Sequence, residues 1–174
     1  MKDLIHDQDY GYIEERIKNG KLEVYEFRHS AGTVIHHFIK REIPVRIEGE
    51  TYYDLITPDS YGGPIISECN EEDKWELVDE FERAFQNYCD ENHIICETVS
   101  FDPLIANAID FVCCYEVECI GETTIDTELC TGKKIWNSEV YEKVCVAMEV
   151  GLDGDFFPAY RRKNLAFAVN ERKV

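Results

Sequence analysis

The stretch KLEVYEFRHSAGTVIHHFIKREIPVRIEGETYYDLIT, residues 21–57, decides the fold expected of this chain. β-Branched and aromatic residues dominate it, and short turn-type breaks divide it, a pattern typical of strands. It predicts four strands, over residues 21–27, 33–39, 43–47 and 51–57. The segment His29-Ser30-Ala31-Gly32 joins the first two as a hairpin. Pro44 has no N–H to donate, so it places the third strand at a sheet edge or at a strand start.

The strongest helix signal in the chain lies over residues 71–89. Asn70 is a capping residue, acids crowd the first turn, and apolar side chains recur along one face at helical spacing, namely Leu77, Phe81, Ala84, Phe85 and Tyr88. The remaining patterns predict a helix over 7–20, a loop over 58–70, strands over 94–101, 111–120 and 123–127, a helical turn over 103–108 and a helix over 137–148. We therefore expect one α+β domain, with helices packed on a largely antiparallel sheet.

Length and charge restrict the possible functions. The chain has 174 residues, 44% of them hydrophobic and 12% aromatic, which is enough apolar material for one folded domain. Its net charge is −18, from 18 Lys and Arg against 36 Asp and Glu. A nucleic-acid partner is not expected, because binding to phosphates requires Lys and Arg.

The expected location of the protein determines the expected state of its cysteines. No apolar run reaches the ~18 residues of a spanning helix, and residues 1–7 do not resemble a signal peptide, so we expect a cytoplasmic protein without a membrane span. The eight cysteines are then expected to be free thiols, mostly buried. Cys113, Cys114 and Cys119 are the nearest approach to a metal-ligand pattern. Adjacent residues of a strand point to opposite faces, so no metal site is expected there.

The segment Thr57-Pro58-Asp59-Ser60-Tyr61-Gly62-Gly63-Pro64 is a candidate ligand loop. Paired glycines let a backbone approach a ligand closely, and their amides can hold an anionic oxygen. The alternative is an ordinary tight turn, since no lysine stands beside the glycines and Pro64 removes one amide.

The motifs in the first two thirds of the chain resemble a known family. Residues 52–58, the Tyr61-Gly62-Gly63-Pro64 loop, the long helix, and Phe101-Asp102-Pro103-Leu104 with Asn107 are similar to the N-terminal part of bacterial GNAT-like acyltransferases. The similarity is to the branch of Fem-type aminoacyltransferases that form peptidoglycan bridges, and it covers about residues 5–120. It implies a single GNAT-like domain over residues 1–128.

A second stretch resembles the extreme C-terminus of the same family. It comprises residues 132–141 and 155–161, and it implies a C-terminal helical segment, 129–174, packing on the same domain. Members of the family are about twice as long, and the part without a counterpart here carries a basic helix and most of the domain that binds the acyl donor. The resemblance therefore implies a shortened chain without the catalytic half.

Two motifs depart from the family pattern. Asp59 and Ser60 stand where the family loop has Tyr and Gly, and Ser100 and Asp102 stand where a later motif has Arg and His. The second change removes a cation and an imidazole, and so makes an anion-attracting pocket neutral or repelling.

Two classes of function follow from the resemblance. The first is acyl or aminoacyl transfer to an amine acceptor of the cell-wall precursor class, with acyl-CoA or aminoacyl-tRNA as donor only by resemblance and no other cofactor expected. The second is a non-catalytic remnant that binds an acceptor, such as a small molecule or peptidoglycan precursor, or forms a homodimer. No catalytic residue is assigned; the candidate ligand-binding residues are Asp54, Tyr61, Gly62, Gly63, Phe101, Asp102 and Asn107.

Overall fold

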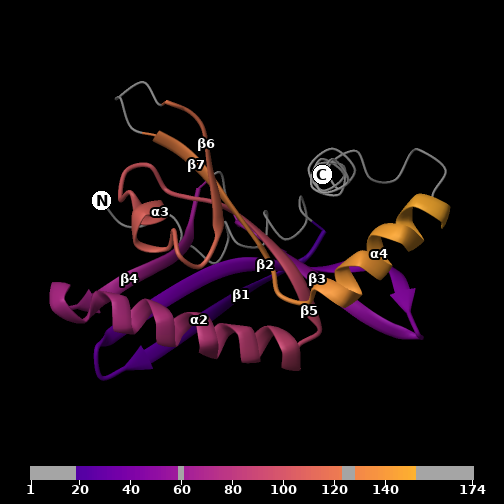
Figure 1. Ribbon diagram of the computed structural model, residues 1–174, viewed down its shortest axis with the longest axis horizontal. Coiled ribbons are helices and arrows are strands. Elements are labelled where there is room, and N and C mark those ends of the chain that lie inside the picture. The colour runs from indigo at the N-terminus through magenta and orange to yellow at the C-terminus, as the bar shows by residue number, and fades with distance from the viewer. Residues whose placement is uncertain (1–18, 59–60, 123–127, 152–174) are drawn as a thin grey trace, which may run out of the picture.

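A computed structural model describes residues 19–58, 61–122 and 128–151. These residues form a seven-stranded sheet with helices packed against it (Figure 1). The strands are β1 Lys21–His29, β2 Gly32–Ile47, β3 Glu50–Ile56, β4 Gly63–Cys69, β5 Ile94–Ser100, β6 Glu116–Glu122 and β7 Glu128–Ile135. The helices are a short 3₁₀ turn η2 Glu71–Asp73, α2 Lys74–Glu91, α3 Asn107–Asp110 and α4 Ser138–Gly151.

The sheet is mixed and mostly antiparallel, as predicted. Its order is β1-β2-β3-β5-β7-β6, with β4 paired to β2 outside this path. The β3–β5 pair is parallel, while the other strand pairs are antiparallel. Strand β7 lies between β5 and β6, so residues on both sides of position 128 belong to the same sheet. Within the described ranges, no helix is both long and apolar enough to cross a membrane.

Several predicted elements differ in detail. The runs 33–39 and 43–47 form one strand, β2, whose pairing with β3 shifts register between Glu42 and Arg46. Pro44 lies at this shift, where a missing N–H removes no regular ladder bond. The predicted loop 58–70 contains strand β4. The expected strand 123–127 and nearly all of the expected helix 7–20 lie outside the described residues.

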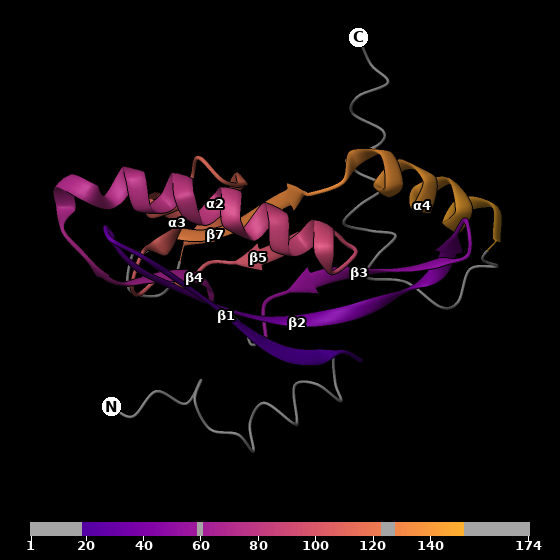
Figure 2. The ribbon, with the colours of Figure 1, turned by 90° about the horizontal axis from the view of Figure 1, so that it is seen from below.

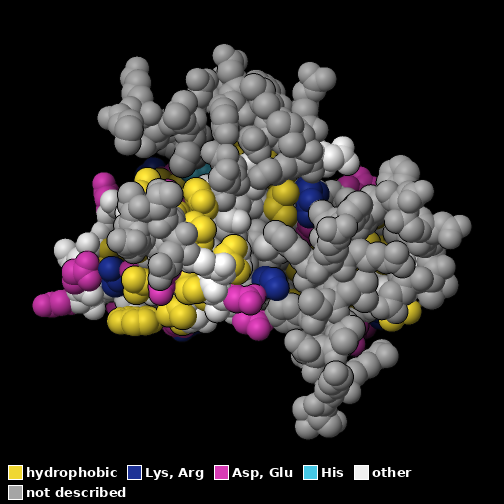
Figure 3. Space-filling view, turned by 90° about the horizontal axis from the view of Figure 1, so that it is seen from above, with side chains coloured by type: hydrophobic (Ala, Val, Ile, Leu, Met, Phe, Trp, Pro, Cys, Tyr) yellow, Lys and Arg dark blue, Asp and Glu magenta, His cyan; other side chains and the backbone are white. Residues whose placement is uncertain are grey.

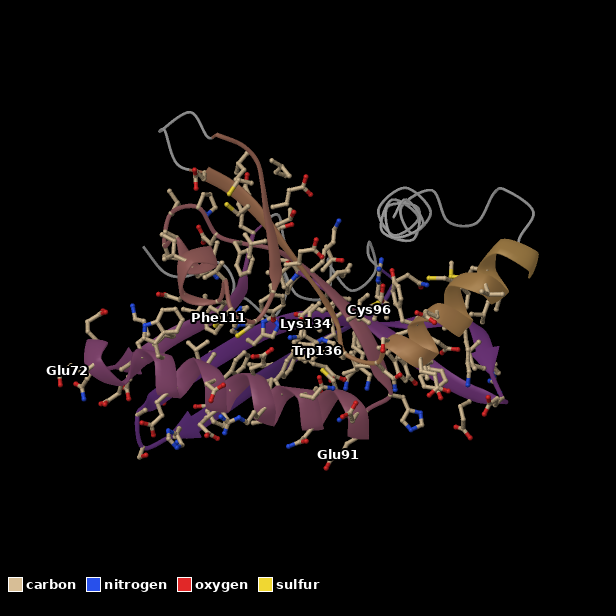
Figure 4. The ribbon with its side chains drawn as sticks, viewed as in Figure 1. Glu72, Glu91, Cys96, Phe111, Lys134 and Trp136 are labelled. Carbon is tan, nitrogen blue, oxygen red and sulfur yellow. The ribbon has the colours of Figure 1, made fainter. Side chains whose placement is uncertain are left out.

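Helix α2 covers one face of the sheet (Figure 2). Its buried side chains are the predicted apolar stripe with small changes: Leu77, Val78, Phe81, Phe85 and Cys89. Figure 4 shows Phe111 and Trp136 next to this helix, and each packs edge-to-face on a helix phenylalanine, with ring centroids 5.6 Å from Phe81 and 5.4 Å from Phe85. A second, smaller cluster joins α4 to the far end of β2 through Val144, Ile43 and Ile47.

We predict that Phe85→Ala lowers the free energy of unfolding by about 3–5 kcal/mol, because it opens a cavity among packed rings. The Phe85 ring is fully buried and contacts rings on β1, β2 and α2. Urea denaturation measures the change. The matched control is Trp75→Ala, which removes a 65% exposed aromatic ring of the same helix and should cost about 0.5 kcal/mol or less. Equal losses in the two variants would contradict the core assignment.

Candidate functional site

The candidate residues meet where one edge of β2 changes partner. Strands β3 and β4 both run antiparallel to β2 on the edge opposite β1. Ile56 lies opposite Ile39, and Gly63 lies opposite His37, so a single β2 residue, Phe38, separates the two pairings. The chain uses six residues, 57–62, to cross this gap. The interruption therefore projects a loop toward β5, the next strand of the sheet.

The loop is fastened to the end of β5 by two hydrogen bonds. The Gly62 N–H donates to the Ser100 carbonyl oxygen at 2.7 Å, and the Ser100 N–H donates to Thr57 Oγ1 at 2.8 Å. We call this meeting point, residues 57, 61–64 and 100–107, the junction. Gly63 opens β4 with φ of +87°, and a Cβ there would lie 2.6 Å from Val99 Cγ1. Both conditions require glycine.

Asn107, at the start of α3, holds the junction together. It is 2% exposed, and its amide nitrogen donates to the carbonyl oxygens of Gly62 and Pro64 at 2.8 and 3.0 Å. Its side-chain oxygen accepts the Asp102 N–H at 2.9 Å. The amide group is thus used three times by the backbone of the junction itself.

The other candidates at the junction have different exposures. Phe101 is buried and packs edge-to-face on Tyr115, with ring centroids 5.7 Å apart. Asp102 accepts the Leu104 N–H through its carboxylate at 2.8 Å, the bond of a turn carboxylate. Tyr61 is 42% exposed.

Asp54 lies before the junction, on β3, and its carboxylate is bound by a cation. The Arg41 Nε donates to its Oδ1 at 2.9 Å, and a second Arg41 nitrogen binds the other oxygen. Such a two-point pair fixes both oxygens in one orientation. The structure therefore brings six of the seven candidates together and places Asp54 in an ion pair between β2 and β3.

A second polar cluster lies inside the core and was not predicted. His36 Nε2 donates to Glu97 Oε1 at 2.5 Å, and the Tyr115 hydroxyl donates to Glu97 Oε2 at 3.0 Å. All three residues are at most 5% exposed. The sequence carried one signal for this cluster, a glutamate within the apolar run of β5, Ile94-Ile95-Cys96-Glu97.

Access decides what each cluster can do. The rings of Phe38 and Phe85 lie with their centroids 5.2 Å from that of His36, so the core cluster is covered by apolar groups. Its hydrogen bonds satisfy both Glu97 oxygens, while the buried His36 Nδ1 has no hydrogen-bond partner among the described residues. At the junction, the Gly62 N–H could have bound an anionic oxygen of a ligand, but it already donates a hydrogen bond to the Ser100 carbonyl oxygen. The arrangement ties strands together and holds Tyr61 and α3 at the surface.

We predict that Asn107→Ala lowers the free energy of unfolding by about 2–4 kcal/mol, because one N–H and two carbonyl groups lose their partner. Asn107→Asp should cost at least as much, because it sets a carboxylate against two carbonyl oxygens although its shape is conserved. Urea denaturation measures both. The control is Asn70→Ala, which removes an exposed asparagine that bonds to a side chain of its own turn. Stability unchanged within ~0.5 kcal/mol in Asn107→Ala would show that the amide does not hold the junction.

We predict that stability falls as the pH rises above about 10, partly through Tyr115. Burial, with the nearby Glu97, raises the pKa of Tyr115 well above its ordinary value, so the folded chain keeps a proton that the unfolded chain releases near pH 10. The unfolded state then binds fewer protons, and each such group lowers the free energy of unfolding by up to ~1.4 kcal/mol per pH unit.

Tyr115→Phe tests this contribution through urea denaturation at pH 8 and pH ~10.5. The lost bond to Glu97 lowers stability at both pH values, whereas the fall between them should be smaller than in the unchanged chain. Identical falls in the two proteins would contradict the role of Tyr115.

Comparison with known proteins gives no match for this chain. No protein-family profile matches it, and neither a curated protein nor a solved structure is significantly similar to it.

Proposed function

We propose that the chain is a GNAT-like module that acts by association, as a homodimer, and not by acyl transfer. The observation that carries the proposal is the exposed apolar surface beside the junction. Four large apolar residues within nine positions are at least 50% exposed, namely Leu104, Ile105, Ile109 and Val112. We call these four residues the α3 surface.

The sheet supports the GNAT-like part of the proposal. A parallel β3–β5 pair is bordered on both sides by antiparallel strands. Helix α2 lies between β4 and β5 in the chain, and so connects the first four strands to the last three. The loop with the Tyr-Gly-Gly-Pro motif lies where β3 ends beside β5. Ends of adjacent parallel strands are a common place for ligand sites. The Tyr61-Gly62-Gly63-Pro64 loop and the Phe101-Asp102 segment thus lie close together.

The contacts at the junction favour association over transfer. Acyl transfer requires free hydrogen-bond donors for the developing oxyanion and a group that accepts the amine proton. The Gly62 N–H and the Asn107 amide are bonded to the backbone, and Asp54 is ion-paired to Arg41. Ser100 and Asp102 occupy the positions where the resemblance expected a cation and an imidazole.

The α3 surface belongs to an end of the molecule where apolar side chains are exposed. Hydrophobic side chains gather at the end of the molecule that carries α3 and the β6–β7 hairpin (Figure 3). Exposed apolar groups that lie close together mark interaction sites more often than scattered ones. The acid on this helix, Asp110, is 3.1 Å from Lys74 Nζ, so its charge is offset locally.

A second copy of the chain is the occupant that we propose. In a twofold dimer, the same surface of each chain forms the interface, and this is the commonest arrangement of soluble oligomers. Two chains of charge −18 repel one another, but at physiological salt charges farther apart than about 8 Å are largely screened. The apolar contact at the α3 surface can then outweigh repulsion between distant acids.

We predict that Ile109→Asp weakens dimerisation about 100-fold or more, because a twofold interface loses two buried isoleucines and gains two buried carboxylates. Analytical ultracentrifugation over a micromolar concentration range measures the equilibrium. Val146→Asp is the matched control, because Val146 is also an exposed apolar helix residue, at 59%, and lies on α4. This variant should dimerise like the unchanged chain.

Two results would contradict the proposal. A monomeric unchanged chain at tens of micromolar would remove the homodimer, and a dimer equally weakened by both variants would place the interface elsewhere. Transfer of an acyl group to an amine by the purified chain, abolished in Asn107→Ala at a temperature where that variant is folded, would restore the enzyme hypothesis.

A further inference from the structure

The β6–β7 hairpin brings two thiols and a carboxylate together. Cys119 on β6 lies directly opposite Cys130 on β7 in the antiparallel register. Glu128 lies two residues before Cys130, hence on the same face of β7, and its Oε2 is 3.7 Å from Cys119 Sγ. The two sulfurs and a carboxylate oxygen all lie within 4.8 Å of one another.

The pairing of the two strands explains how Glu128 reaches this cluster. The register shifts between Cys119 and Gly121, so two residues of β6 stand opposite Leu129. Such a bulge increases the local twist and redirects side chains. The cluster spans β7 and β6, the last strand in the sheet order; Cys119 and Glu128 are exposed, and Cys130 is buried.

We propose that Cys119, Glu128 and Cys130 bind a thiophilic divalent cation of the Zn²⁺ class. Thiolate sulfur is the ligand that zinc prefers, a carboxylate is an accepted third ligand, and a water can complete four-coordination. Directly opposed strand residues are close enough to share one ion.

Binding of the cation at this cluster requires that both thiols lose their protons. As each sulfur–metal bond forms, the thiol gives its proton to the buffer, and no electron is transferred.

The same cluster has one competing chemistry, a disulfide between Cys119 and Cys130. Opposed strand positions fall within the Cα separation that a disulfide needs, about 4.4–6.8 Å. A disulfide would leave Glu128 without a role, whereas a metal ion uses all three groups. The experiment must therefore separate the two.

The test is a Co²⁺ titration of the reduced, metal-free full chain. We expect one Co²⁺ per chain, with thiolate-to-cobalt charge-transfer absorption, tetrahedral d–d bands, release of protons into a weakly buffered solution, and displacement of Co²⁺ by Zn²⁺. Cys119→Ser and Cys130→Ser should each abolish the charge-transfer band of the pair. Glu128→Gln should keep both thiolates but weaken binding by more than about tenfold, the least that even outer-shell changes cost.

The control is Cys113→Ser, which removes an exposed thiol outside the cluster and should bind Co²⁺ like the unchanged chain. Because Cys119 and Glu128 are exposed, their variants should fold, and circular dichroism checks this for each. Absence of the charge-transfer band in the reduced chain, or its loss only in Cys113→Ser, would overturn the proposal. So would equal affinity in Glu128→Gln, or loss of both thiols to a disulfide with no metal bound under reducing conditions.

Discussion

One buried carboxylate constrains the arrangement of the core. Glu97 is 3% exposed, and a carboxylate taken out of water without partners costs several kcal/mol. Its two oxygens are met by His36 from β2 and by Tyr115 from the segment before β6. Strand β5 can satisfy Glu97 in this way only in the register in which both donors reach it. The position of β5 then sets where its end, Ser100, meets the loop that leaves β3.

The strands and the long helix could be predicted because their signals are local. The β1–β2 hairpin follows from two β-rich runs around a short turn, and α2 follows from an apolar stripe at helical spacing. Strand β4 could not be predicted in the same way, because Gly63-Pro64 at its start is a turn signal and the partner that makes it a strand, β2, lies about 30 residues earlier in the chain. Long-range pairing overrode local composition.

The sequence indicated the candidate residues but not the contacts that they make. The motif residues from the loop and from the segment after β5 do meet, and Asn107 is the contact between them. Their hydrogen bonds could not be inferred, since sequence patterns do not tell whether an amide faces a ligand or a carbonyl of its own backbone. The opposition of Cys119 and Cys130 was equally hidden, because it depends on the register of β6 against β7.

The parallel β3–β5 pair has a consequence for the order of folding. The β1–β2 and β6–β7 pairs join strands that are close neighbours in sequence, and such pairs can form early. Strand β5 pairs with β3 although β4 and α2 lie between them in the chain. Before this pair can form, the chain must lose the conformational entropy of closing the segment between the two strands. We expect the two hairpins to form before β5 joins them. Insertion of β5 would then be the step that sets the folding rate.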